Sequence, residues 1–128
     1  MDRADDGHDT VHQPHFSSLR RAGDLVFVSG HMALDSALRP LGDDVAAQTT
    51  TCLTRIAELL ATVGLGRADI VKTTVWLTRR EDFPRFDAAY GAFFSGCELP
   101  TRATVRADLM VPGALVEIEA VARDAGAL

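Results

Sequence analysis

The side chains of greatest chemical interest in this chain alternate along two segments near its C-terminal end. Side chains project from alternate faces of a β-strand, so Arg102, Thr104 and Arg106 would share one face of a strand. Glu117 and Glu119 would share one face of a following strand. If a tight connection makes the two strands a hairpin, Arg102 and Thr104 come within reach of Glu117.

Two interpretations of this arrangement remain open on the pattern alone. In the first, Arg102 and Glu117 form a cross-strand ion pair at the surface, which stabilises a sheet by only about 0.2–1 kcal/mol. In the second, they form a small anion site. A guanidinium binds a carboxylate through two parallel hydrogen bonds, and a carboxylate beside it can hold and activate a water molecule.

Other catalytic motifs are missing from the sequence. It has no G-x-G-x-x-G, no phosphate-binding Walker loop, no G-x-S-x-G and no H-E-x-x-H, so we expect no cofactor. His8, His12 and His15 have a spacing that could bind a metal on a helix, but their segment has no helical pattern. We interpret them as solvated histidines and expect no metal.

Composition narrows the class of protein further. The 128 residues suffice for one domain, with 47% hydrophobic and 24% charged residues. The net charge of −5 argues against a nucleic-acid partner, and no apolar run approaches the ~20 residues of a membrane span. We therefore expect a cytoplasmic protein without a membrane or nucleic-acid partner. We interpret Cys52 as a small buried hydrophobic residue and Cys97 as a free thiol in a loop.

The elements follow from periodicity and from capping and turn residues. Residues 1–14 are polar and non-periodic and are expected to form a mobile arm, whereas residues 15–128 form one domain. Within it we expect a β-β-α-β-α-β-β order, which suits a single mixed sheet with both helices on one face, an α+β fold. The expected elements are strands at 16–21 and 25–29, a helix from 45 capped by Asp43 or Asp44, a strand at 70–78, an aromatic-striped helix capped by Asp82, and the hairpin strands 101–107 and 114–123.

Three stretches resemble the Rid family of YjgF-type proteins in order and spacing. They are GDLVFVSGH, DIVKTTVWLTRREDFPRFDAAYGAFF and PTRATVRADLMVPGALVEIEAVA, and the likeness covers about residues 14 to 124. The resemblance implies a chorismate-mutase-like fold and a homotrimer with clefts between subunits. It also implies hydrolysis of reactive 2-imino or enamine acids to 2-keto acids and ammonia. The alternative is a non-catalytic trimer that binds a small carboxylate or acts as a chaperone.

The resemblance also assigns site residues. Arg102 matches the arginine that binds the substrate carboxylate, and Glu117 matches the glutamate that positions or activates the attacking water. The remaining candidate substrate-binding residues are those that line the family's cleft or replace its residues. Ser29 and Gly30 match a serine-glycine turn, Thr104 stands where cysteine is frequent, and Asp87 where asparagine is contributed across the subunit boundary.

Two positions depart from the family pattern. Phe16 stands where a tyrosine hydroxyl faces the substrate, and it keeps the ring but loses the hydrogen bond. His31 stands where glutamine is frequent and would add a donor or a base to the pocket. Together they indicate a deaminase specialised to one pathway.

Overall fold

The structure is a computed structural model that describes residues 14–126. The expected N-terminal arm, with His8 and His12, lies almost entirely outside the described residues. In chain order the elements are β1 (Leu19–Ala22), β2 (Leu25–Met32), α1 (Val45–Ala61), the 3-10 turn η1 (Arg67–Asp69), β3 (Ile70–Leu77), the 3-10 turn η2 (Arg80–Asp82), α2 (Phe83–Phe93), β4 (Thr101–Arg106) and β5 (Val116–Arg123). The expected β-β-α-β-α-β-β order is confirmed.

One five-stranded sheet has the strand order β1-β2-β5-β3-β4. All neighbouring strands are antiparallel except β3 and β4, which are parallel. The hairpin expected from the sequence is therefore wrong, because β3 lies between β4 and β5. The chain reaches β4 from β3 through α2, and a helical crossover of this kind places the two strands parallel and adjacent.

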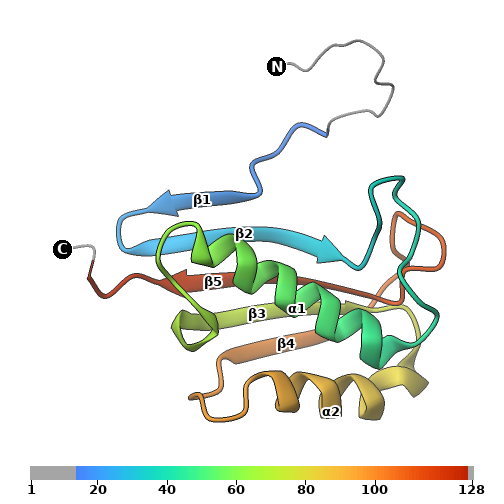
Figure 1. The fold of residues 1–128 in the computed structure, drawn as a ribbon. Coiled ribbons are helices and arrows are strands. Elements are labelled where there is room, and N and C mark those ends of the chain that lie inside the picture. The colour runs from blue at the N-terminus through green and yellow to red at the C-terminus, as the bar shows by residue number, and fades with distance from the viewer. Residues whose placement is uncertain (1–13, 127–128) are drawn as a thin grey trace.

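Both helices pack on the same face of the sheet, and within residues 14–126 no helix covers the other face (Figure 1). The strands contribute their inward-facing side chains to the core because period-two alternation sends the others to the open face. α2 contributes the aromatic stripe, in which Phe86, Tyr90 and Phe94 are at most 3% exposed. The core also contains Val26, Val28, Leu53, Ile56, Leu60, Val75, Leu77, Val116 and Ile118.

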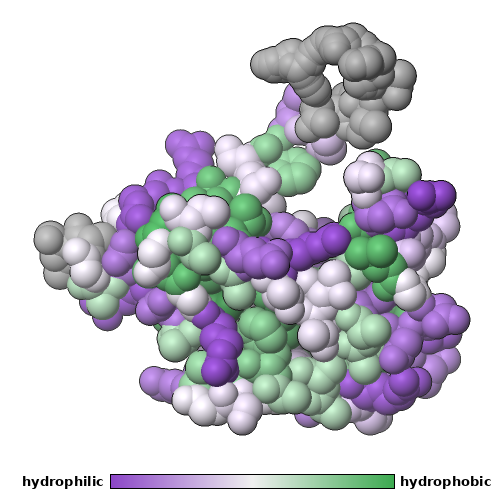
Figure 2. Space-filling view, viewed as in Figure 1, coloured by the Kyte–Doolittle hydropathy of each residue, from purple (hydrophilic) through white to green (hydrophobic). Residues whose placement is uncertain are grey.

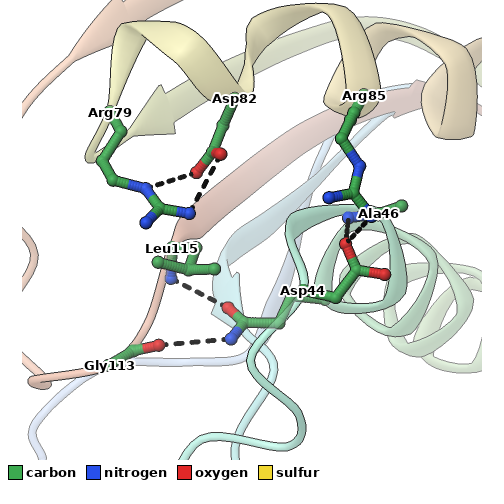
Figure 3. A network of polar contacts seen from close by, with 8 residues as sticks. Asp44, Ala46, Arg79, Asp82, Arg85, Gly113 and Leu115 are labelled. Carbon is green, nitrogen blue, oxygen red and sulfur yellow. Dashed lines mark hydrogen bonds and ion pairs between the residues drawn. The ribbon is translucent and has the colours of Figure 1, made fainter.

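The helix starts are held by carboxylates in two different ways. Asp44 is the N-cap of α1, where its side chain accepts a hydrogen bond from the backbone N–H of Ala46. Asp82 occupies the N-cap position of α2, but its side chain makes no capping bond. It accepts two hydrogen bonds from Arg79 instead, at 2.9 and 3.0 Å (Figure 3).

Gln48, on the first turn of α1, ties together two loops at one end of the sheet. Its side chain is fully buried and donates to the carbonyl oxygens of Gly42 and Gly113 while accepting from the N–H of Leu115. Figure 3 shows the bonds to Gly113 and Leu115. A Cβ at Gly113 would lie 2.8 Å from Pro40 Cγ, so the two loops touch there. Gln48 thus fixes the loop that leads into β5.

The two cysteines differ in environment. Cys52 is fully buried in α1, and burial raises the pKa of its thiol to about 12, which confirms its interpretation as a small hydrophobe. Cys97 is half-buried and free, with Arg67 Nη1 3.0 Å from its sulfur. Among residues 14–126 there is no helix long and apolar enough to cross a bilayer.

Candidate functional site

Glu117 lies on the open face of the sheet, over a bulge in the neighbouring strand. Val28 pairs with Ala120 and His31 with Ile118, so β2 uses one residue more than β5 in this interval. Because of the extra residue, Ser29 and Gly30 have no regular partners on β5 and form the bulge. A Cβ built on Gly30 would lie 2.5 Å from Glu117 Oε2, so the carboxylate occupies space that only glycine leaves open.

The carboxylate of Glu117 borders a hollow of 310 Å³. Burial raises the pKa of Glu117 above the ordinary range for a glutamate, and the nearby carboxylate of Glu119 raises it further. A carboxylate in this setting is a stronger base than one in water. Its place beside an open hollow allows it to hold a water molecule. The other residues lining the hollow are Gly30, Trp76, Ala107, Asp108, Leu109 and Met110.

Arg102 lies on the opposite, helix-covered face of the sheet. Its guanidinium carbon lies 5.7, 5.2 and 4.7 Å from the ring centroids of Phe83, Phe86 and Tyr90. Its Nη1 donates to Asp87 Oδ1 at 2.8 Å. The stacked rings and one carboxylate hold the guanidinium in place, and its side chain stays 22% exposed.

Register places Arg102 and Glu117 on opposite faces. Arg102 pairs with Thr73, and Thr73 pairs with Ala120; both partners are buried under the helices, so Arg102 lies on that face. Glu117 lies between the buried Val116 and Ile118 along β5, so its side chain points to the open face. The expectation that the two come within reach of each other in one chain is wrong. The ion pair between them is wrong as well, because the carboxylate bound to Arg102 is that of Asp87.

The other predicted site residues divide between these two places. Asp87 forms an ion pair with Arg102 of its own chain, and Thr104 is a half-buried neighbour along β4. Ser29 lies by the bulge, with its hydroxyl donating to the carbonyl of Ser17 at 2.6 Å. Phe16 directly precedes Ser17 and is 62% exposed.

His31 lies apart from Glu117. It shares the helix-covered face with Ile118 and lines a hollow with Arg55 and Glu58 of α1. Its Nδ1 lies 2.7 Å from the carbonyl oxygen of Ser29. Within one chain, the ring is therefore separated by the sheet from the hollow that it was expected to serve.

Several residues around Glu117 escaped the sequence analysis. Trp76 could have been found, because it alternates with the buried Val75 and Leu77 and so belongs to the open face. Asp108 and Met110 lie in the loop before β5, where no periodicity indicates direction. In the part of the chain that the structure describes, no three His, Cys, Asp or Glu side chains gather as a metal cluster.

The fold and these two places define a class: a small α+β protein with one mixed sheet, helices on one face, and an arginine and a glutamate on opposite sides of the sheet. Residues 10–124 match the family described as Endoribonuclease L-PSP. The chain belongs to this family, which is also the Rid or YjgF family. The resemblance noted from the sequence is therefore confirmed.

Relatives and solved structures agree with this assignment. The chain is 37% identical over 102 residues to Protein DfrA of Myxococcus xanthus, covering 79% of this chain and 77% of that protein. It is 33% identical to a 2-iminobutanoate/2-iminopropanoate deaminase of Salmonella typhimurium, covering 78% and 80%. The Rid-family protein YyfA of Yersinia pestis has a TM-score of 0.81 at 27% identity, covering 88% and 90%. The YjgF gene product of E. coli has a TM-score of 0.78 at 30% identity, covering 84% and 87%.

Proposed function

We propose that this protein hydrolyses reactive 2-imino acids, or their enamine tautomers, to 2-keto acids and ammonia without a cofactor. The observation that carries the proposal is the carboxylate of Glu117, which burial makes more basic and which borders a hollow large enough for a small substrate. The relatives named as 2-iminobutanoate/2-iminopropanoate deaminases, at 32% and 33% identity, support the same chemistry.

In the proposed reaction Glu117 acts first as a base. It takes a proton from a water molecule while the water oxygen bonds to the imine carbon, and it delivers this proton to the imine nitrogen. The resulting carbinolamine then collapses. Glu117 takes the proton of the new hydroxyl and delivers it to the amine, so that the C–N bond breaks, ammonia leaves and the hydroxyl oxygen becomes the keto oxygen. For an enamine, protonation of the adjacent carbon gives the imine first.

Arg102 would bind the substrate carboxylate. Asp87 occupies one of its nitrogens, and the rings beneath orient the remaining N–H groups. A fixed guanidinium binds a carboxylate more strongly than a flexible one, because less side-chain entropy is lost on binding. The carboxylate then places the imine carbon for attack.

The two faces of one sheet cannot contribute to one substrate site, so we propose that the site forms between chains. Arg102, Thr104 and Asp87 of one chain would meet Glu117, Gly30, Ser29 and Phe16 of the next. A homotrimer, which the resemblance to the Rid family implies, would provide such contacts. The open face supports an interface because it carries exposed apolar side chains, including Phe27 and Val105, that no helix covers.

A coupled assay tests the activity. A pyridoxal-phosphate dehydratase generates 2-iminobutyrate in situ, and the rate of keto-acid release is compared with and without this protein. We expect acceleration over spontaneous hydrolysis. Carboxylate binding without any acceleration would contradict the enzyme and favour the alternative, a non-catalytic binding or chaperone-like module.

Two variants test the residue roles. Losing the charged hydrogen bonds of Arg102 in Arg102→Ala should lower kcat/KM at least about tenfold, and Arg102→Lys should restore it in part. Glu117→Gln keeps the shape and removes the base, so carboxylate binding should survive while kcat falls by roughly 10²–10⁴-fold. Wild-type turnover in both variants would overturn these assignments.

A further inference from the structure

A second hollow lies at the carboxyl ends of β3 and β4, where the chain turns into α2. It has a volume of 310 Å³ and is lined by Leu77, Arg80, Phe83, Thr104, Val105 and Arg106. Hydrophilic side chains gather on the surface over this turn (Figure 2). The hollow adjoins Arg102, whose guanidinium lies 5.7 Å from the ring centroid of Phe83.

The arginines in this region differ in their partners. Arg79, Arg85 and Arg102 each bind a carboxylate, at 2.9, 2.6 and 2.8 Å. Arg80 and Arg106, which line the hollow, have no ion pair and no side-chain hydrogen bond within residues 14–126. Their positive charge is available to a ligand.

Nearby carboxylates do not neutralise these two arginines. Asp82 is bound by both side-chain nitrogens of Arg79 that face it. Glu81 is exposed and Asp108 borders the hollow of Glu117, and neither forms an ion pair with an arginine of the described chain. The hollow therefore combines two unneutralised guanidiniums with apolar walls, a setting that favours an anion.

Position along β4 relates the hollow to the proposed carboxylate site. Arg102, Thr104 and Arg106 share one face, and successive members are about 6.6 Å apart along the strand. A substrate held by Arg102 through its 2-imino carboxylate would extend past Thr104 toward Arg106. A substrate with a short apolar side chain would make no contact with Arg80 or Arg106.

We propose that this hollow is a second anion subsite and that the substrates are 2-imino or enamine acids whose side chain ends in a second carboxylate. This inference rests on the proposed function. Arg102 holds the carboxylate next to the reacting carbon, and Arg80 and Arg106 hold the terminal one.

The kinetic test compares two imines of equal chain length. Amino-acid oxidases, with catalase present, convert glutamate to 2-iminoglutarate and norvaline to 2-iminopentanoate. We expect wild-type kcat/KM to favour 2-iminoglutarate. In Arg106→Ala and Arg80→Ala the ratio of the two kcat/KM values should fall about tenfold, the loss of one charge-assisted hydrogen bond. Arg123→Ala removes an exposed arginine bound to Asp24, far from the hollow, and should leave the ratio unchanged.

The failures of the two proposals are distinguishable. Turnover of both imines with an unchanged ratio in the Arg80 and Arg106 variants would overturn the subsite and leave the deaminase in place. If neither imine is turned over, calorimetry decides the subsite. Tighter binding of glutarate than of pentanoate, lost in Arg106→Ala, would support it, and equal binding of the two acids would overturn it.

Discussion

At residue 30 the lack of a side chain determines where the carboxylate of Glu117 lies. The β-bulge presents the Gly30 backbone to the carboxylate, and a Cβ there would overlap Oε2 at 2.5 Å. The overlapping group is the end of a side chain, so it can move without disturbing the fold. Residue 30 thus controls the geometry of the proposed base and contributes little to stability.

The variant Gly30→Ala should fold and bind carboxylates but lose catalytic rate. Displacing a base by about 1 Å can cost ~10²-fold, so we expect kcat to fall by ~10–10²-fold. Gly91→Ala is the matched control, because a Cβ there meets nothing within 4 Å. Steady-state kinetics should show a lower kcat for Gly30→Ala only, and thermal melting should show that both variants are folded. Wild-type kcat in Gly30→Ala would show that the exact place of Glu117 is irrelevant.

The raised pKa of Glu117 predicts the pH dependence of turnover. The base is active only when ionised, so kcat/KM should fall as the pH is lowered through this raised pKa. The acid limb should therefore lie above the ordinary glutamate range of about 4.3. A pH profile with its acid limb at or below that value would contradict the assignment of Glu117 as the base.

The same group should affect stability. Its pKa is higher in the folded chain than in the unfolded chain, so folding is favoured while Glu117 is protonated. The free energy of unfolding loses this contribution as pH rises from the unfolded pKa to the folded one. Above this window Glu117→Gln should melt higher than the wild type, and the difference should vanish at acid pH. A lower Tm for Glu117→Gln at pH 8 would contradict the stated direction.

At the scale of elements, Gln48 connects α1 to the loop of Gly42 and to the loop before β5, which lines the hollow of Glu117. Its buried amide makes three hydrogen bonds to backbone groups. Gln48→Ala leaves these buried backbone groups without hydrogen-bond partners. It should therefore lower the free energy of unfolding by about 2–4 kcal/mol. Thr50→Ala, on the exposed side of the same helix, should change it by less than ~0.5 kcal/mol. Denaturant titration measures both, and equal effects would remove the special role of Gln48.

Local pattern determined the helices more reliably than the sheet. The apolar period and Asp44 predicted α1, and the aromatic stripe predicted the buried face of α2. The order of strands depends on contacts distant in sequence. Even so, a helix between β3 and β4 indicates a parallel pair, and the loop of residues 107–115 is long for a hairpin. These two signals could have corrected the expected topology.

The site was harder to predict than its residues. Alternation correctly placed Glu117 and Glu119 on one face, but the face of Arg102 depends on the neighbour of β4. The rings that hold Arg102 come from a helix, and no local pattern links them to a strand arginine. The bulge that separates His31 from Glu117 is also set by pairing with β5.

At the scale of the whole molecule, the open face of the sheet, which no helix of residues 14–126 covers, is the expected interface with other chains. The proposed trimer would cover this face and join the two half-sites. Light scattering coupled to size exclusion should give three times the 13.8 kDa mass of the chain. A monomer at micromolar concentration would contradict both the trimer and the shared site.

A mixing experiment tests the central claim, that Arg102 and Glu117 of different chains serve one substrate. Arg102→Ala and Glu117→Gln chains, each expected to have strongly reduced activity alone, are mixed in equal amounts, unfolded together and refolded. Random assembly gives about a quarter of the sites an intact arginine from one chain and an intact glutamate from the next, so about a quarter of wild-type turnover should return. Mixed oligomers that form but stay as inactive as the separate variants would contradict the account.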